Sequence, residues 1–319
     1  MDISIIITAF NKGPYIRECL LGVLEQDFQG DFEVILADDC STDNTYEEIN
    51  SLREHPNFAK IRYTRHPENK GLMSNFIWAL NQARGEYVSF CDGDDVWISN
   101  QKISNQILFL RNHSEYGGCG MLMDIVDTRN EFSKVEYSDL HFPYKKDTVI
   151  RDAEVLDFIR FPFGTSTFMF RKSLLSLSVL SKFEFVKVSN DYVLFVLLHQ
   201  KSKLYFLNQL SVRRNHNESG ITSNDNEIHL FLIVNNYLIF KRLRKIVEIS
   251  ESTAPSLILN KKIVEHKELI IKKYSNRNLQ EFFKTLSYYK SFKNNIVLFY
   301  YLLTLLPYLL FSKFKLKLV

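Results

Sequence analysis

The sequence predicts an α/β fold in which a mostly parallel β-sheet is flanked by helices. Short apolar runs rich in Ile and Val recur through the first 90 residues, which is typical of strands buried on both faces. Amphipathic stretches with helical periodicity separate these runs, and the connections between them are short. Such an alternation calls for right-handed crossovers that place helices on both faces of one sheet.

The strands and helices that carry this prediction lie in the first part of the chain. Ile3–Ala9 is too short for an ordinary helix, and Pro14 suits the first turn of the helix that follows it. The expected strands are residues 3–9, 32–37, 61–64 and 87–90, and the expected helices are residues 14–26, a helix from residue 45, one through residues 76–83 and one over residues 101–111.

The elements after residue 111 are expected from shorter patterns. The expected strands are residues 121–126, 163–171, 203–207 and 210–213, and the expected helices begin at Lys172 and just after Asp191. Gly164, Thr165 and Ser166 place small polar groups at the start of the 163–171 strand. Residues 130–148 are charged and aromatic without a clear period, which predicts a loop or hairpin facing the site.

Length and composition fit one large domain with an appendage. The chain has 319 residues, of which 45% are hydrophobic. Residues 241–319 carry 16 Lys and Arg against 5 Glu, a formal charge of +11, while the remainder carries −8. A basic segment of this kind indicates contact with an anionic surface, either nucleic acid or a membrane.

The cysteines and the N-terminus point to a reducing compartment. The four cysteines are widely spaced and form no CxxC pair, which favours reduced core residues over a disulfide framework or a zinc site. The first residues lack the basic segment of a signal peptide and lead directly into a strand. We therefore expect a cytoplasmic location.

An acidic cluster, Asp92-Gly93-Asp94-Asp95, directly follows the strand at residues 87–90. Carboxylates this close repel one another unless solvent, a cation or hydrogen-bond donors offset their charge. For the cluster alone, a solvated turn in which Asp95 serves as a cap is the simplest interpretation. Polar residues also follow two other strands, at residues 8–12 and 38–43, and such strand ends meet at the edge of a parallel sheet where ligands bind. This repeated placement favours a binding site.

Two further polar positions lie in the second half of the chain. Asp191 directly precedes an apolar helix, where it is either an N-cap or a site carboxylate. Arg214 and His216 combine a cation with a titratable imidazole, an arrangement that a solvated basic turn also explains. The sequence has neither GxGxxG after the first strand nor GxxxxGK[ST], so the usual mechanisms of dinucleotide and P-loop binding are absent.

These segments together resemble the family 2 glycosyltransferases of the bacterial surface-polysaccharide type, which are inverting, sugar-nucleotide-dependent enzymes with the Rossmann-like GT-A fold. The resemblance extends over residues 3–223, about two thirds of the chain. The segments that carry it are residues 4–11, 37–43, 69–71 with Asn81, 85–88 and 92–97. It implies a GT-A domain over residues 1–223, followed by a C-terminal extension over residues 224–319.

The resemblance also implies a role for each matched residue. The residues implied to bind the nucleotide-sugar donor are Thr8, Ala9, Phe10, Asn11, Lys12, Asp39, Asn69, Gly71, Asp92, Gly93, Asp94 and Arg214. Mn²⁺ or Mg²⁺ would be held against the donor diphosphate by Asp94, together with Asp92 and His216. Asp191 would be the general base that takes a proton from the acceptor hydroxyl, with inversion at the anomeric carbon. The family commonly has Glu-Asp where this chain has Asn190-Asp191, so the base is kept but a neighbouring charge is lost.

Residues 224–319 are expected to form a helical extension that associates with a membrane. Helices are predicted at residues 229–245 and 258–274, and residues 296–311 form an uncharged apolar segment flanked by lysines. As a helix, this 16-residue segment would be about 24 Å long, shorter than the roughly 30 Å hydrocarbon core. We therefore expect it to lie in the cytoplasmic leaflet with its lysines on anionic lipid. The alternatives are a buried helix, a homodimer interface and a membrane span.

The expected function is transfer of a sugar from a UDP-hexose or UDP-N-acetylhexosamine to a hydroxyl of a lipid-linked or polysaccharide glycan, at the inner face of the cell membrane. No nucleic-acid-binding module is recognisable, so a nucleic acid partner is not expected. One alternative is a catalytically silent sugar-binding or scaffold protein of the same fold. Another is a sugar nucleotidyltransferase, although the Gly-rich loop with Arg and Lys that such an enzyme needs after its first strand is absent.

Overall fold

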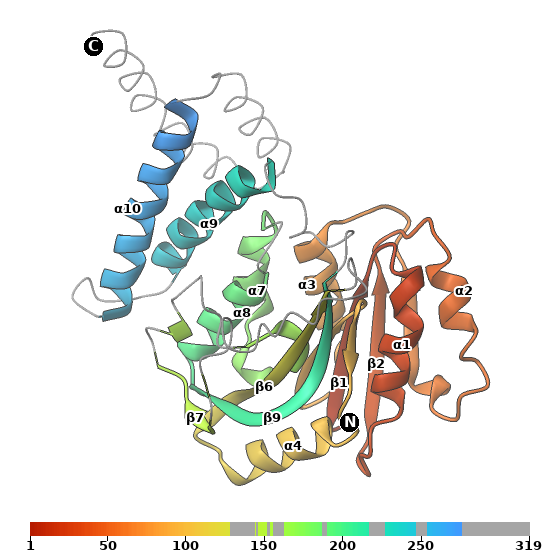
Figure 1. Cartoon of the computed structure of the whole chain (residues 1–319). Helices are drawn as coiled ribbons and strands as arrows, with labels where there is room; N and C mark the ends of the chain where they lie inside the picture. Colours follow the sequence, from red (N-terminus) through yellow and green to blue (C-terminus); the bar gives the residue numbers. More distant parts are fainter. Residues whose placement is uncertain are drawn as a thin grey trace, which may run out of the picture. The chain divides into compact units, whose positions relative to one another are not determined.

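The computed structural model describes residues 1–127, 144, 146–151, 154–155, 163–186, 190–216, 227–246 and 254–275 (Figure 1). The chain divides into two compact units. The first comprises Met1–Ser181 and Ser189–Gly220, and the second comprises Lys182–Val188 and Ile221–Val319. The functional division expected after residue 223 stays a prediction.

The described residues of the first unit form a nine-stranded sheet in the order β3-β2-β1-β4-β8-β6-β9-β5, with β7 paired to β9. The strands are β1 (Ile3–Ala9), β2 (Phe32–Asp38), β3 (Ile61–Arg65), β4 (Tyr87–Asp92), β5 (Asp95–Trp97), β6 (Tyr116–Asp127), β7 (Thr148–Val149), β8 (Met169–Arg171) and β9 (Lys203–His216). Every residue of β2 is buried, as the apolar run predicts. β9 curves along the sheet in Figure 1, and register shifts in the β6–β9 pair accompany the bend.

Helices cover both faces of this sheet. On one face, α1 (Gly13–Leu24) and α4 (Lys102–Asn112) share a core with Ile5 and Ile7 of β1. On the other face, Phe76 of α3 (Leu72–Gln82) stacks on Phe90 with ring centroids 4.8 Å apart. The remaining helices of this unit are α2 (Thr45–Asn50), α7 (Leu177–Leu180) and α8 (Asn190–His199), and the 3₁₀ turns are η1 (Phe58–Lys60), η2 (Thr165–Thr167) and η3 (Lys172–Leu174).

The sheet is mixed, so the prediction of a mostly parallel sheet is wrong for its second half. β1, β2, β3 and β4 pair in parallel, and so do β6 and β9. β8 pairs antiparallel with both β4 and β6, and β5 and β7 pair antiparallel with β9. The strand–helix alternation that predicts parallel crossovers ends at β4. Partners beyond that point are far apart along the chain, and no local period specifies their direction.

Four local predictions after β4 also differ from the structure. Residues 95–97 form strand β5 instead of a turn, because they pair with Val212, Arg213 and Arg214 of β9. The predicted strand at residues 163–171 is a strand only from Met169, since the Thr167 N–H bonds to Gly164 O in a 3₁₀ turn. The helix predicted from Lys172 is a 3₁₀ turn followed by the short α7. The two strands predicted at residues 203–207 and 210–213 are one continuous strand, β9.

The described part of the second unit contains two long helices, α9 (Glu227–Ile246) and α10 (Ala254–Ser275), which pack against each other. The helices predicted at residues 229–245 and 258–274 are thereby confirmed. Phe240 meets His266 edge-on with ring centroids 5.0 Å apart. Within the described residues, every helix falls short of the length and apolar character that crossing a membrane requires. The predicted membrane segment at residues 296–311 lies outside the described residues, and so does most of the predicted loop at residues 130–148.

Candidate active site

The carboxyl ends of β1, β2 and β4 lie next to one another. Ala9 is opposite Asp38 in the β1–β2 pair, and Thr8 is opposite Asp92 in the β1–β4 pair. This register confirms the prediction that the polar residues after these strands gather at one edge of the sheet.

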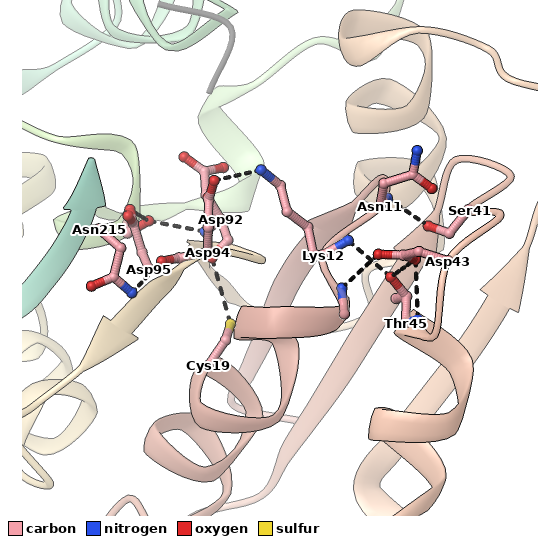
Figure 2. A network of polar contacts seen from close by, with 12 residues as sticks. Asn11, Lys12, Cys19, Ser41, Asp43, Thr45, Asp92, Asp94, Asp95 and Asn215 are labelled. Carbon is pink, nitrogen blue, oxygen red and sulfur yellow. Dashed lines mark hydrogen bonds and ion pairs between the residues drawn. The ribbon is translucent and has the colours of Figure 1, made fainter. Parts of the chain in front are cut away.

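The loop after β1 is joined to the loop after β2 by hydrogen bonds (Figure 2). Asn11, at a φ of 52°, donates its N–H to Ser41 Oγ at 2.9 Å and accepts the Thr42 N–H at 2.8 Å. Asn tolerates this left-handed conformation because its short polar side chain bonds locally. The Lys12 N–H donates to Thr45 Oγ1 at 2.8 Å. These contacts fix the backbone from which the Lys12 side chain extends.

Asp43 anchors the same network. Its carboxylate accepts the Gly13 N–H at 2.9 Å and the Thr45 N–H and hydroxyl at 3.1 and 2.5 Å. Burial by itself raises the pKa of Asp43, but these donors outweigh it and hold the pKa below its ordinary value. Asp43 is therefore an ionised anchor at the start of α1 and α2.

Asp39 holds the loop that precedes α3. Its carboxylate accepts the N–H groups of Lys70 at 2.7 Å and Gly71 at 2.9 Å, and its carbonyl accepts Asn69 Nδ2 at 3.2 Å. Gly71 has a φ of 82°, a conformation that favours glycine. Asp39 is only 4% exposed, so it organises the loop that carries Asn69 and Gly71. Its contact with a nucleotide base stays a prediction.

The other predicted donor-binding residues lie at the same edge. Thr8 and Ala9 end β1, and Phe10 exposes 45% of its surface just beyond them. Asn69 is exposed on the loop before α3. Their roles in nucleotide binding stay predictions.

The acidic cluster forms a tight turn between β4 and β5. The Gly93 N–H donates to Thr8 O at 3.1 Å, which ties the turn to β1. Lys12 Nζ is 2.5 Å from Asp94 Oδ2, and Asn215 Nδ2 donates to Asp94 O at 2.9 Å (Figure 2). The side chains of Lys12 and Asp94 are only 15% and 17% exposed, so the ion pair is largely shielded from water.

Arg214 is a second cation near the acidic turn. It lies opposite Asp95 in the β5–β9 pair and keeps an exposed surface. Desolvation lowers the pKa of Arg214, but nearby carboxylates outweigh this effect and raise it. In order of effect, these carboxylates are Asp95, Asp92, Asp94 and Asp191. Arg214 therefore links the acidic turn electrostatically with the predicted base.

The carboxylates of the turn differ in their acidity. Burial, together with repulsion from Asp94, raises the pKa of Asp92 to about 6. Burial also raises the pKa of Asp95 well above its ordinary value, and Asp95 Oδ2 accepts a 2.5 Å hydrogen bond from Ser166 Oγ. The predicted capping role of Asp95 is wrong, because Asp95 is a buried strand residue held by Ser166.

Asp191 lies in the first turn of α8. Its Oδ1 accepts the Tyr192 N–H at 2.8 Å, and its Oδ2 accepts the Thr165 hydroxyl at 3.1 Å. Burial raises the pKa of Asp191, while these donors and Arg214 partly oppose the rise. Since α8 begins at Asn190, Asp191 is a helical residue and not the N-cap. A partly buried carboxylate with a raised pKa suits a general base.

Three residues contribute to this arrangement in ways that the sequence did not indicate. Ser166 Oγ accepts the Asp92 N–H at 2.9 Å and also donates to Asp95. Thr165 contacts Asp191, and Asn215 contacts Asp94. The small polar run at residues 164–166 was a signal for the first two, although it predicted a strand and not these contacts. Nothing in the local sequence singles out Asn215.

The donor atoms of Asp92 and Asp94 fit a hard divalent cation. Mg²⁺ is commonly bound through one or two carboxylates together with substrate phosphates. Within the described residues, no group of three His, Cys, Asp or Glu side chains is arranged to hold a metal ion. A cation at Asp92 and Asp94 would therefore need further oxygen ligands, of the kind that a diphosphate supplies. His216 ends β9, and its side chain lies outside the described part of the chain.

Two relatives are similar to this chain over part of their length. An uncharacterized glycosyltransferase of Haemophilus influenzae is 31% identical over 168 residues, which cover 50% of this chain and 66% of that protein. WfaP of Escherichia coli, a UDP-Glc:alpha-D-GlcNAc-diphosphoundecaprenol beta-1,3-glucosyltransferase, is 34% identical over 114 residues, covering 36% of this chain and 43% of WfaP. The chain therefore spans less than two thirds of the length of either relative.

Structure and family comparisons agree with these relatives. TarS of S. aureus, residues 1–349 in complex with UDP-GlcNAc, superposes with a TM-score of 0.67 at 18% identity, covering 99% of this chain and 92% of that chain. This similarity shows the GT-A-like fold. The family model described as glycosyl transferase family 2 matches residues 4–177, which is more than half of the chain. The chain belongs to glycosyl transferase family 2.

Proposed function

We propose that this chain is an inverting glycosyltransferase that moves a sugar from a UDP-hexose or UDP-N-acetylhexosamine to a hydroxyl of a glycan acceptor. One observation carries the proposal. Asp191 is a partly buried carboxylate with a raised pKa, and Arg214 interacts electrostatically both with it and with the acidic turn at the carboxyl end of β4. A base and a diphosphate site at one edge of the sheet are what sugar transfer from a nucleotide donor requires.

The donor diphosphate is bound between the loop after β1 and the acidic turn. Lys12 and Arg214 supply positive charge to its oxygens. Asp94 and Asp92 would hold Mn²⁺ or Mg²⁺, whose charge offsets the charge that develops on the departing nucleoside diphosphate. If Asp94 held the cation, its contact with Lys12 would be given up, and the Lys12 ammonium group would be available to the phosphates. The 2.5 Å distance between Lys12 Nζ and Asp94 Oδ2 supports this assignment, because the ammonium group for the phosphates lies beside the carboxylate for the metal.

Asp191 acts on the acceptor. The acceptor hydroxyl oxygen attacks the anomeric carbon from the face opposite the diphosphate, and its proton passes to the Asp191 carboxylate. The bond from the anomeric carbon to the diphosphate oxygen breaks with both electrons, and the nucleoside diphosphate leaves. One displacement inverts the anomeric configuration and needs no covalent intermediate. The hydroxyl of Thr165, 3.1 Å from Asp191 Oδ2, keeps the carboxylate in one orientation.

The acceptor is a lipid-linked or polysaccharide glycan at the inner face of the cell membrane. The name of WfaP, which describes transfer to a diphosphoundecaprenol-linked sugar, supports an acceptor of this class. The +11 charge of residues 241–319 and the uncharged segment at residues 296–311 support a peripheral position on anionic lipid.

A donor screen tests this function. The protein is incubated with UDP-glucose, UDP-galactose, UDP-GlcNAc, UDP-GalNAc and GDP-mannose, with membrane extract as acceptor, and nucleoside diphosphate release is measured with Mn²⁺ and with EDTA. We expect release from a UDP-sugar that requires the metal and the extract. Tight binding of glycan without release from any donor would favour a silent sugar-binding protein. Pyrophosphate release from UTP and a sugar phosphate would favour a nucleotidyltransferase.

A further inference from the structure

Lys102 is a fully buried lysine behind the acidic turn. It begins α4 and has no exposed surface. Its Nζ donates to Ser89 Oγ at 3.0 Å and to Gln106 Oε1 at 2.8 Å, and it lies 3.9 Å from the centre of the Trp97 ring. Burying an ammonium group is costly, and burial lowers the pKa of Lys102 to about 7. An apolar side chain would fill the same core space without this cost.

The three groups that Lys102 contacts each hold one of three consecutive carbonyls. Trp97 Nε1 donates to Ser166 O at 3.0 Å. Gln106 Nε2 donates to Thr167 O at 2.9 Å, and Ser89 Oγ donates to Phe168 O at 2.8 Å. Trp97, Gln106 and Ser89 belong to β5, α4 and β4, so Lys102 connects three elements to one short segment of backbone.

That segment joins the two halves of the candidate site. Thr165 Oγ1 donates to Asp191 Oδ2 at 3.1 Å on the acceptor side. Ser166 Oγ donates to Asp95 Oδ2 at 2.5 Å and accepts the Asp92 N–H at 2.9 Å on the donor side. We name residues 165–168 the bridging segment, because the hydroxyls of Thr165 and Ser166, at adjacent positions, contact the predicted base and the acidic turn.

We propose that Lys102 is a positioning residue that, by holding Trp97, Gln106 and Ser89, fixes the bridging segment and so sets Asp191 relative to the donor-binding carboxylates. The inference rests on the proposed function, since it assigns Asp191 and the acidic turn to one reaction. Lys102 touches neither substrate, so its effect passes through the carbonyls of residues 166–168 and the hydroxyl of Thr165. Small displacements of reacting groups lower the rate of the chemical step more than they weaken substrate binding.

The first test measures how firmly the bridging segment is held and does not depend on activity. Hydrogen exchange is compared between the wild type and Lys102→Met, a substitution that keeps an unbranched side chain but removes the ammonium group. The N–H groups of Thr167 and Phe168, which bond to Gly164 O and Thr165 O, should exchange about tenfold faster in the variant, with β1 and β2 unchanged. Arg111→Met is the matched control, because it removes an exposed cation from the same helix. Unchanged exchange at Thr167 and Phe168 would overturn the proposal.

The second test is a double-mutant cycle with Thr165→Val. Lys102→Met should lower kcat about 10- to 100-fold while changing the donor KM by less than about threefold. In the Thr165→Val background the same substitution should cost less than about threefold in kcat, because the link to Asp191 is already lost. Equal losses in both backgrounds, or a loss confined to KM, would overturn the proposal.

A milder variant covers the case in which Lys102→Met does not fold. Ser89→Ala removes only the hydroxyl that joins Lys102 to Phe168 O, and it should show the same faster exchange and the same dependence on Thr165, to a smaller extent. Failure of the proposed function is distinguishable from failure of this inference. A wild type that releases no nucleotide from any donor would contradict the function, whereas the exchange measurement would still decide whether Lys102 holds the segment.

Discussion

At the scale of single residues, the candidate site is a balance of charge. The carboxylates of Asp92 and Asp94 are opposed by the side chains of Lys12 and Arg214, and Asp95 is buried with a raised pKa. We expect the donor diphosphate and a cation to rearrange these groups at low cost, because both signs of charge are already present.

Lys12→Met tests this balance. Removal of the cation takes one neighbouring positive charge away from the Asp94 carboxylate, so the metal-free variant should lose about 1–2 kcal/mol of stability, less than a fully buried pair would lose because both partners are partly exposed. Thermal unfolding with and without Mn²⁺ measures this loss. Mn²⁺ should stabilise the variant more than the wild type, since the metal ion replaces the missing positive charge. Arg111→Met, which breaks an exposed pair with Asp2, is the control. An equal effect of Mn²⁺ on wild type and variant would contradict the account.

Asp92→Asn should stabilise the donor-free protein in a pH-dependent way. The pKa of Asp92 is about 6 in the folded protein against 3.8 ordinarily, so the folded state binds the proton more tightly than the unfolded state. Stability is then lost as pH rises from about 4 to above 6, and the amide avoids this loss. We expect a gain of about 1–3 kcal/mol at pH 7.5 that shrinks toward pH 4. Urea unfolding at several pH values measures the gain, with the exposed Glu54→Gln as control; a gain that does not vary with pH would refute the explanation.

At the scale of elements, the site depends on short pieces of structure placed by longer ones. β1, β2 and β4 bring their carboxyl ends into register, and helices on both faces keep them there. The contacts that orient the carboxylates come instead from the turn between β4 and β5, from η2 and from the loop before α3. Asp39 illustrates the last of these, since it is a buried acceptor for two backbone N–H groups.

Gly71→Ala tests the contribution of the loop before α3. The φ of 82° at Gly71 is unfavourable for a residue with a Cβ, so we expect a loss of about 1–3 kcal/mol in the free energy of unfolding and weaker binding of UDP. Urea unfolding and calorimetric titration measure the two effects. Lys70→Ala is the matched control, because it alters the neighbouring exposed side chain. Similar stability and affinity for both variants would show that the conformation of Gly71 does not matter.

The sequence was informative where local periodicity specifies structure. The strands β1 to β4 and the helices between them followed from apolar runs and from their spacing, and so did the gathering of Thr8, Asp38 and Asp92 at one edge. β5 and the 3₁₀ turn at Thr165–Thr167 did not follow. Each is only three residues long. β5 is defined by pairing with the distant β9, and Ser166 of the turn has its side-chain partners at the distant Asp92 and Asp95.

At the scale of the whole molecule, the chain combines a family 2 glycosyltransferase unit with a basic second unit. The charge of the two parts differs in sign, since residues 241–319 carry +11 and the remainder carries −8. In the second unit, Lys245 and Lys267 lie close enough to Lys241 for their repulsion to add to the effect of burial in lowering its pKa. A concentration of like charge of this kind is costly unless an anionic partner offsets it.

Deletion of residues 296–319 tests the proposed membrane contact. The full chain should sediment with vesicles that contain anionic lipid and less with neutral vesicles, and the truncated chain should lose most of this binding, because it lacks the apolar segment and three lysines. A variant with Lys313, Lys315 and Lys317 changed to Ser keeps the apolar segment and should show weaker, less salt-sensitive binding. Undiminished sedimentation of the truncated chain would contradict a role of this segment in anchoring.

The central claim is that Asp191 is the base for sugar transfer from a nucleotide donor. The most direct measurement compares Asp191→Asn with the wild type, recording donor affinity by calorimetric titration and transfer by nucleotide release with the donor and acceptor found in the screen. We expect donor affinity within about threefold of the wild type and transfer slower by about 10²–10⁴-fold, because the amide keeps the shape of the side chain but takes no proton. Transfer by Asp191→Asn at close to the wild-type rate would contradict the account.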